Sequence, residues 1–585
     1  MRIMEYVRDI FLMLIVFILF YMIFSPVLEA RQIKISRIEK MPEQPEPFEI
    51  RDWKQTAREY DEFLYDFEQQ GEYLPLIRWR DNRINFQLDT PWIPSYVGGE
   101  GGGEAINVIA SVLGASLAGI DKSEQQGQNW VIKQKEFFNE ADEKNLILNH
   151  PRARTGGSFW YEIFPGILFY SLVDLYPDTS RQKTPTISGR KPLNMKDMMY
   201  QSAEKFREAV YHMAEKPDKP NFNWTGFDFD KMEPVYNGVW REPDGAAGIA
   251  WLQYAAYQKF GEQNFLEGAE LSLNFLEDID YNPMYEILLA YGAYTAARMN
   301  AEQGFDYDLT RFINWCFEPS DTRSGWGIIV DQWGDFDVYG LHGSTTDRNG
   351  YAFAMNTFQM AGALLPIVRY DTRYADSFGK WMLNLVNSAR LFYGKYHPAE
   401  HQSSDFWSEY PESILAYEGL RKRGPVTIPI GRQVSPYVTG DAVRENWAPT
   451  DIGLYGSSHV GILGGIVNKT AHDKILKLDL LKTDFFNNSA YPTYLYYNPY
   501  PEEKMINLDL PQRTGQFEQT EEFSLYDVVS KKYIEKNKSN RAEFIIEPRS
   551  SVVLVVVPAG GTEEIIKSQK LVEGTVIDFN YEKAE

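Results

Sequence analysis

The amino-acid sequence predicts a mainly α-helical protein that ends in an antiparallel β-sandwich. Apolar residues recur at helical spacing through the middle of the chain, and short β-type runs separated by turn residues follow after about residue 480. The chain of 585 residues is also too long for one compact core of ordinary size. We therefore expect two or more domains.

The N-terminal segment carries a targeting or membrane pattern. Residues 10–24 are apolar without a break, Arg2 and Arg8 precede them, and a weak cleavage sequence follows at Leu28-Glu29-Ala30. The apolar run is long for a secretory signal and nearly long enough to span a bilayer. Residues 1–30 are therefore expected to be a cleaved signal peptide or a retained anchor, with membrane attachment through residues 10–28. Either alternative predicts export, by secretion or into the cell envelope.

The next segment, residues 31–50, is polar and rich in proline, which predicts a linker. Residues 51–479 form the expected helical domain. Apolar side chains recur at helical spacing after Asp244, a candidate helix N-cap, and again over residues 265–276 and 378–392. Long Gly-, Pro- and aromatic-rich loops connect these helices, and such loops on a helical scaffold often carry function.

The character of the sequence changes for residues 480–585. Short β-type runs are separated there by turn residues such as Asn498-Pro499, Pro511 and Pro548. Several strands at this spacing indicate a β-sandwich. Because the strands carry few acidic and aromatic clusters, we expect a structural module and not the active site.

Charge and cysteine content exclude several functions. The net charge of −23 opposes binding to nucleic acid or to highly charged glycans. The single cysteine, Cys316, rules out an intrachain disulfide or a cysteine zinc site, and its apolar helical surroundings predict a buried core residue. We expect no cofactor and no metal.

Acidic side chains meet Trp, Tyr and Gly repeatedly in the helical region. Aromatic faces pack on the C–H faces of sugar rings, carboxylates hydrogen-bond hydroxyls, and two carboxylates form the pair that breaks a glycosidic bond. The four clusters span residues 156–162, 240–245, 331–337 and 400–407.

A helical domain with acid-bearing loops and a following β-sandwich resembles the (α/α)6-toroid carbohydrate-active enzymes, which include glycoside hydrolase and polysaccharide lyase families. The resemblance covers about residues 51–585 at the level of architecture. It implies a toroid-like helical barrel whose site is a cleft at one end, lined by loops at the starts of the inner helices. Because a fold alone does not determine chemistry, the residues must carry the functional prediction.

The first cluster places Glu162 in the opening turns of a helix that Ser158 is able to cap, beside Trp160 and Tyr161. Aromatic neighbours would desolvate the carboxylate and raise its pKa toward that of a general acid. The alternative is a charge that the helix dipole stabilises. Trp160 and Tyr161 are candidate sugar-binding residues.

The second cluster contains Trp240, Glu242 and Asp244. Asp244 is well placed as a helix N-cap. Glu242 has no comparable structural role, although Arg241 is a candidate salt-bridge partner for it. We expect one of these two carboxylates to reach the cleft, with Trp240 as a sugar platform.

The third cluster lies in a longer loop, residues 326–347, that is rich in Gly, Asp and aromatic residues. Trp333, Asp337 and His342 are candidate substrate-binding residues, and Asp347 is a candidate base that activates water. The alternatives are structural: Asp347 would fix a turn, and a lone histidine is more often part of the packing.

The fourth cluster offers His401 and Trp407 for substrate binding. His401, Asp405 and Glu409 recur every four residues and would share one face of a helix as metal ligands. The sequence around them is a poor helix start, so metal binding is the lesser alternative.

These patterns predict an exported glycoside hydrolase acting on a neutral or weakly charged oligo- or polysaccharide. Glu162 or Glu242 would protonate the leaving oxygen, and Asp244 or Asp347 would activate water. The second hypothesis is a polysaccharide lyase, with a base such as Tyr161 or His342. The third is a glycan-binding or envelope-assembly protein without turnover.

Overall fold

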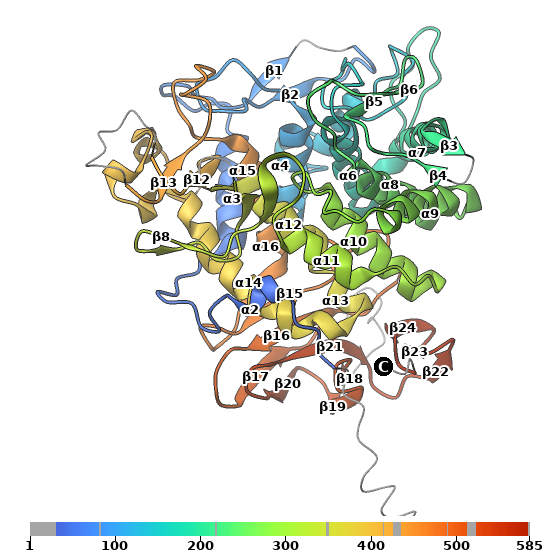
Figure 1. The fold of residues 1–585 in the computed structure, drawn as a ribbon, viewed down its shortest axis with the longest axis vertical. Helices are drawn as coiled ribbons and strands as arrows, with labels where there is room; N and C mark the ends of the chain where they lie inside the picture. Colours follow the sequence, from blue (N-terminus) through green and yellow to red (C-terminus); the bar gives the residue numbers. More distant parts are fainter. Residues whose placement is uncertain are drawn as a thin grey trace, which may run out of the picture.

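The structure is a computed structural model, and it describes residues 31–582 except 81–83, 217–218, 347–349, 414, 425–433, 488 and 512–521. Helices make up the larger part of the molecule, and antiparallel sheets of the C-terminal part lie along one side of it (Figure 1). The predicted order, a helical domain followed by antiparallel β-structure, is confirmed.

The inner helices of the helical domain form a closed ring. Each helix packs against the next, and the last pair packs against the first. The ring consists of α4 (Ala105–Leu117), α6 (Phe159–Leu175), α8 (Gly245–Phe260), α10 (Leu288–Arg298), α12 (Ala354–Leu364) and the kinked pair α15 (Leu454–His459) and α16 (Gly461–Ile466). This closed ring of six inner positions is the toroid that the resemblance implied.

A second set of helices packs outside the ring or beside it. These helices are amphipathic: in α3 and α9, buried residues alternate with exposed polar ones at helical spacing. The helices are α3 (Trp53–Leu64), α7 (Met195–His212), α9 (Gln263–Asp278), α11 (Leu309–Phe317) and α14 (Ala375–Ser388), with the short α5 (Trp130–Lys133) and α13 (Ile367–Tyr370).

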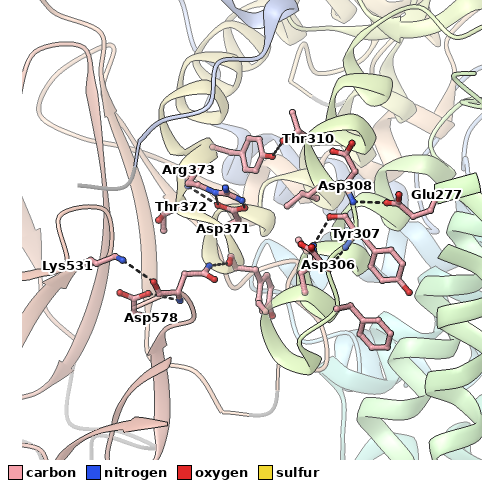
Figure 2. A pocket seen from close by; sticks show the side chains of 18 residues that line it. Glu277, Asp306, Tyr307, Asp308, Thr310, Asp371, Thr372, Arg373, Lys531 and Asp578 are labelled. Carbon is pink, nitrogen blue, oxygen red and sulfur yellow. Dashed lines mark hydrogen bonds and ion pairs between the residues drawn. The ribbon is translucent and has the colours of Figure 1, made fainter. Parts of the chain in front are cut away.

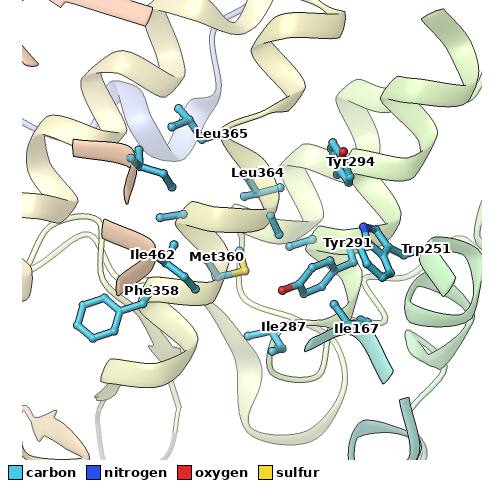
Figure 3. Close-up of a cluster of buried hydrophobic side chains, with 14 of the residues drawn as sticks. Ile167, Trp251, Ile287, Tyr291, Tyr294, Phe358, Met360, Leu364, Leu365 and Ile462 are labelled. Carbon is cyan, nitrogen blue, oxygen red and sulfur yellow. The ribbon is translucent and has the colours of Figure 1, made fainter. Parts of the chain in front are cut away.

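Large side chains from the inner helices fill the ring (Figure 3). Trp251 and Tyr291 lie edge to face with ring centroids 5.9 Å apart. The Tyr291 hydroxyl donates to the Gln359 Oε1 at 2.6 Å. His459 lies on the other side of Gln359, and burial lowers its pKa to about 4. The centre of the ring is therefore a packed core.

Glycines bring the two ends of the ring together. A Cβ on Gly461 would lie 2.0 Å from the carbonyl oxygen of Gly114, and a Cβ on Gly114 would lie 2.7 Å from the carbonyl oxygen of Ser458. Both distances are too short for a real side chain. The ring closes here because neither helix carries a side chain at the contact.

An antiparallel five-stranded sheet, which the sequence did not predict, lies among the connections between inner helices. Its order is β13-β12-β11-β10-β7, and β11 leads directly into α12. The strands are β7 (Trp326–Ile328), β10 (His342–Ser344), β11 (Tyr351–Phe353), β12 (Gly419–Arg421) and β13 (Tyr437–Thr439). Small hairpins pair β1 (Arg78–Arg80) with β2 (Thr90–Trp92), β3 (Ala214–Lys216) with β4 (Lys219–Pro220), β5 (Gly226–Asp228) with β6 (Glu233–Val235) and β8 (Gln332–Trp333) with β9 (Phe336–Asp337).

The C-terminal part has two layers around its main sheet. Tyr497 contacts Gly379 of α14 on one face of the sheet, and Tyr496 packs on Phe544 of β20 on the other. The six-stranded sheet has the order β14-β15-β16-β21-β18-β19, a separate two-stranded antiparallel sheet pairs β17 with β20, and a meander joins β22, β23 and β24. The main sheet begins at Val467, before the expected boundary at 479/480.

The C-terminal strands are β14 (Val467–Lys469), β15 (Leu476–Asp479), β16 (Thr493–Asn498), β17 (Lys504–Asp509), β18 (Phe523–Asp527), β19 (Lys532–Lys538), β20 (Arg541–Ile546), β21 (Ser550–Pro558), β22 (Glu563–Ile566), β23 (Gln569–Val572) and β24 (Thr575–Asp578).

The segment expected to be a linker packs against the helical domain. It contains the short helix α2 (Ser36–Glu39), its side chains Ile35, Ile38 and Met41 are buried, and the Ile33 N–H donates to the Arg373 carbonyl oxygen at 2.7 Å. The anchor or signal predicted for residues 1–30 lies outside the described residues. In the part of the chain that the structure describes, no helix has the length and apolar character needed to cross a bilayer.

The ring contact can be tested with Gly461→Ala. The added methyl group meets backbone atoms of α4 that cannot move independently, so we expect a loss of about 1–3 kcal/mol in the free energy of unfolding. Gly101→Ala is the control, because a Cβ there meets nothing within 4 Å. Thermal unfolding should show a lower Tm for the first variant only, and equal Tm values would contradict the contact.

Candidate active site

A cavity of about 480 Å³ opens at the end of the ring where the inner helices begin. It is lined by Tyr96 before α4, Trp160 at the start of α6, Glu286 before α10, Phe353 before α12 and Tyr455 at the start of α15. We name it the first compartment. The structure thus has a cavity where the toroid resemblance implied a cleft.

A second compartment of about 590 Å³ adjoins the first. Tyr161, Tyr285 and Arg323 line both cavities. The second compartment extends over the start of α6 and the loop before it, where Glu162 and Glu242 contribute to the wall. Together the two compartments form one mouth with a junction at the three shared side chains.

Glu418 is a buried carboxylate in the first compartment. The Tyr96 hydroxyl donates to its Oε1 at 2.5 Å, and the Tyr351 hydroxyl and the Asp441 N–H donate to its Oε2 at 2.6 Å and 3.0 Å. Burial and the nearby charge of Asp441 raise the pKa of Glu418 to about 7. Gly440 leaves room for the carboxylate, since a Cβ there would lie 2.9 Å from Oε2.

Glu286 is the second carboxylate of the first compartment. Its backbone has a φ of 58°, an uncommon conformation for a residue other than glycine and one that costs about 1–3 kcal/mol. Burial and the charge of Glu242 raise the pKa of Glu286 to about 7. The Tyr285 hydroxyl hydrogen-bonds the side chain and lowers its pKa, and one amide contact comes from the Asn356 Nδ2 at 3.5 Å. Glu286 therefore has fewer hydrogen-bond donors holding it in the charged form than Glu418 has.

Tyr161 stands at the junction with 48% of its surface accessible. Burial of its hydroxyl, with the charges of Glu104, Glu286, Glu242 and Glu418, raises the pKa of Tyr161 well above its usual value. The phenol therefore stays protonated at neutral pH and is suited to donate a hydrogen bond.

Arg323 is the cation at the junction. It donates from Nη1 to the Tyr285 hydroxyl at 2.8 Å, and its guanidinium carbon lies 4.5 Å from the Trp240 ring centroid. The positive charge of Arg323 lowers the pKa values of Glu242 and Glu286 and so opposes the effect of burial.

Glu162, the first predicted acid, is 2% exposed and accepts from three backbone N–H groups. Gly156 and Gly157 donate to its Oε1 at 2.7 Å and 3.1 Å, and Phe227 donates to its Oε2 at 2.9 Å. Burial raises the pKa of Glu162 to about 8. The carboxylate joins the loop before α6 to strand β5 and lines the second compartment.

The side-chain oxygens of Glu242 and Asp244 also accept hydrogen bonds from other groups of the protein. Glu242 accepts from the Ser158 hydroxyl at 2.8 Å, the Trp160 N–H at 3.0 Å and the Trp240 indole at 2.9 Å. Asp244 is at the N-cap position of α8 as predicted, but its side chain accepts from the Tyr285 N–H at 2.9 Å and is fully buried. Glu242 lines the second compartment, and Asp244 lines neither compartment.

The other predicted site residues divide between the mouth and the packing. Trp160, Tyr161 and Trp240 line the mouth. Trp333 and His342 are 1% and 0% exposed, and burial lowers the pKa of His342 to about 3. His342 stacks behind Trp326, a wall residue of the first compartment.

Residues of the last two clusters lie away from the compartments. Asp337, His401 and Trp407 line neither of them, and Trp407 packs over Gly394. Asp347 lies outside the described residues. Over the described ranges, no group of three or more His, Cys, Asp or Glu side chains is arranged to hold a metal ion. Cys316 is fully buried, as predicted.

Glu286 and Glu418 were missed because neither lies in a tryptophan-rich cluster. Both directly follow a tyrosine, as Glu162 follows Tyr161. The sequence signal that could have identified them is a Tyr-Glu pair that lies just before or in the first turn of an inner helix, or just before a connecting strand.

A separate cavity of about 560 Å³ lies at the other end of α10, beside the C-terminal domain (Figure 2). Its cations are already bonded: Lys531 donates to the Asn580 and Tyr581 carbonyl oxygens, and Arg373 pairs with Asp371 at 2.7 Å. This cavity is a domain junction, and its charged groups are not grouped for acid–base chemistry.

Comparisons with known proteins give matches at the level of solved structures. No family model and no curated protein matches the chain. A GH127 β-L-arabinofuranosidase from Geobacillus stearothermophilus T6 is 10% identical, with 89% of this chain and 82% of that chain covered and a TM-score of 0.33.

Two further solved structures are similar to this chain at 10% identity. A GH127 β-arabinofuranosidase matches over 88% of this chain and 80% of its own, with a TM-score of 0.36. A protein described as a glycoside hydrolase matches over 79% and 74%, with a TM-score of 0.35. These structural neighbours are glycoside hydrolases.

The buried carboxyl group of Glu162, with its raised pKa, predicts a pH-dependent stability. Its pKa is about 8 in the folded protein and 4.5 ordinarily, so the folded state binds the proton more tightly and stability falls as the pH rises between these values. In Glu162→Gln this contribution disappears, and Tm should change less between about pH 5 and about pH 8. Glu124→Gln, an exposed position, should keep the parental slope. An unchanged slope in the first variant would contradict the raised pKa.

Proposed function

We propose that this protein is a glycoside hydrolase that acts on a neutral or weakly charged oligo- or polysaccharide. The observation that carries the proposal is the pair of carboxylates, the buried Glu418 and the partly buried Glu286, in one cavity walled by aromatic side chains. Burial raises the pKa of each to about 7, which is the range in which a carboxyl group donates or accepts a proton at neutral pH.

The surroundings of the two carboxylates suggest different roles. Glu286 has two side-chain hydrogen-bond partners, Tyr285 and Asn356, and no backbone amide, and it lies near the negative charge of Glu242, so it retains a proton and acts as the general acid on the leaving oxygen. Glu418 accepts from two phenols and one amide, which stabilise its ionised form. On the opposite side of the bond, Glu418 acts either as a base that activates water or as a nucleophile that attacks the anomeric carbon. Inversion of the anomeric configuration in the product indicates the first reaction, and retention indicates the second.

Aromatic side chains of the mouth supply surfaces for sugar rings. Trp160 forms part of the first compartment, and Trp447, which also lines it, is 58% exposed. Tyr161 offers its phenol at the junction. The general-acid role predicted from the sequence for Glu162 or Glu242 stays a prediction. Because protein donors already hydrogen-bond their carboxyl oxygens, we favour a structural role for both residues in the wall of the second compartment.

The lyase alternative has less support at this mouth. A lyase base must lose its proton, whereas the pKa of Tyr161 is raised and His342 is buried behind Trp326. Export remains part of the proposal because of the apolar pattern in residues 1–30, and sequencing the N-terminus of the mature protein tests it.

Substitution of the carboxylate pair tests the mechanism. Glu286→Gln and Glu418→Gln should each lower kcat by about 10²–10⁴-fold on a cleaved glycan, because each removes a proton-transfer group or a nucleophile. Glu100→Gln, an exposed residue of the loop beside Tyr96, is the matched control and should keep full activity. Mass analysis of products formed in ¹⁸O-labelled water should show one added labelled oxygen.

An unsaturated product that absorbs ultraviolet light would favour the lyase, and binding without any product would favour a protein without turnover. Near-parental kcat in both glutamine variants would remove this pair from the mechanism.

The pH dependence of kcat/KM provides a separate test. The reaction needs Glu286 protonated and Glu418 ionised, and both pKa values are about 7, so kcat/KM should follow a bell centred near neutral pH. In the residual activity of Glu418→Gln only the fall on the alkaline side should remain. A rate that stays flat over the range from about pH 5 to about pH 9 is incompatible with this pair.

A further inference from the structure

The second compartment differs from the first in charge. His150, Arg152, Arg154 and Arg323 all line it, whereas Arg323 is the only Arg or Lys side chain among the described residues that line the first. The two cavities meet at Tyr161, so one substrate chain can occupy both. Each compartment is lined by three carboxyl groups, so the second compartment differs from the first by its additional cationic side chains.

The carboxyl oxygens of the second compartment accept hydrogen bonds from neutral donors and not from its arginine side chains. Glu162 is held by backbone N–H groups, and Glu242 by Ser158, Trp160 and Trp240. Glu104 accepts from the Asn149 side chain at 2.8 Å and from the Ser95 hydroxyl at 2.7 Å. None of these three forms an ion pair with a described arginine.

Arg154 is the cation with the greatest freedom to bind a ligand. Arg152 pairs with Asp142 at 3.2 Å, and Arg323 is stacked on Trp240. Arg154 is exposed, lines the compartment, and has no ion pair or hydrogen bond with any residue that the structure describes. Its planar guanidinium fits the paired oxygens of a carboxylate or a sulfate.

We propose, building on the glycoside hydrolase function, that the second compartment binds one anionic group of the substrate, a sugar carboxylate or sulfate, through Arg154. The neutral ring beside it then occupies the first compartment, and the bond to be cleaved lies at the junction beside Tyr161. One anionic group is compatible with the acidic protein, because the compartment offers a local cation, whereas a polyanion meets the net charge of −23.

The test compares three monosaccharides in titrations followed by ligand-observed NMR: glucose, glucuronate and glucose 6-sulfate. They share a ring and differ at the sixth carbon, so their relative affinities report the anionic group. The full-length protein should bind at least one anion about 5-fold or more tightly than glucose, and about 0.5 M NaCl should weaken this preference. Comparison of glucuronate with glucose 6-sulfate distinguishes the two sources of the charge.

Variants assign the preference to the residue. Arg154→Gln should bring the anion close to the affinity of glucose, and Arg154→Lys should retain part of the preference. Arg181→Gln is the control, because Arg181 is exposed near the other end of α6 and pairs with Asp178 at 3.3 Å. Equal affinities for all three sugars in the parent protein, or a preference that survives Arg154→Gln, would overturn the inference.

The binding test of the second compartment does not depend on whether the protein cleaves a glycan. Loss of the anion preference in Arg154→Gln supports the compartment even if no glycan is cleaved, in which case only the hydrolase proposal fails. Cleavage of neutral glycans with no anion preference in the parent leaves the hydrolase and removes the anionic compartment.

Discussion

The closure of the helical ring at Gly114 and Gly461 is the constraint on which the rest of the structure depends. Six inner positions leave a gap unless the last pair of helices reaches the first, and here the backbones meet without an intervening side chain. The closed ring then fixes where the inner helices begin. Since the catalytic candidates lie in the loops at those positions, the geometry of the mouth follows from this close contact.

The mouth places carboxylates where two physical effects oppose each other. Hydrogen-bond donors, including backbone N–H groups near helix starts, favour ionised carboxylates, whereas exclusion of water disfavours them. For Glu162, Glu286 and Glu418 burial is the larger effect, and the pKa of each is raised to about 7 or 8. These residues differ in the groups that bond to their carboxyl oxygens: backbone N–H groups hold Glu162, whereas Glu286 is bonded by the Tyr285 hydroxyl and has one long contact from the Asn356 amide. A raised pKa alone therefore does not distinguish an acid–base residue from a structural carboxylate.

The sequence predicted the architecture better than the chemistry. Helical spacing and turn-bounded β runs depend on local patterns, and both were confirmed, as was the buried Cys316. The acidic and aromatic clusters located two wall segments, around Trp160 and Trp240, because those segments begin inner helices. The clusters did not distinguish aromatic side chains that line the mouth from those that pack in the interior, such as Trp333. Glu418 depends on tyrosines 322 and 67 positions away, which no local pattern reveals.

Ring closure also determines when the protein can finish folding. The side chain of His459 bonds to the carbonyl oxygen of Ile106, 353 positions earlier in the chain. During synthesis at about 5–20 residues per second, the earliest inner helix emerges roughly 20–70 s before its last neighbour exists. Throughout that interval the face of α4 that packs on α15 and α16 has no partner in the nascent polypeptide, so a chaperone or other transient cover would suit the biogenesis of this molecule.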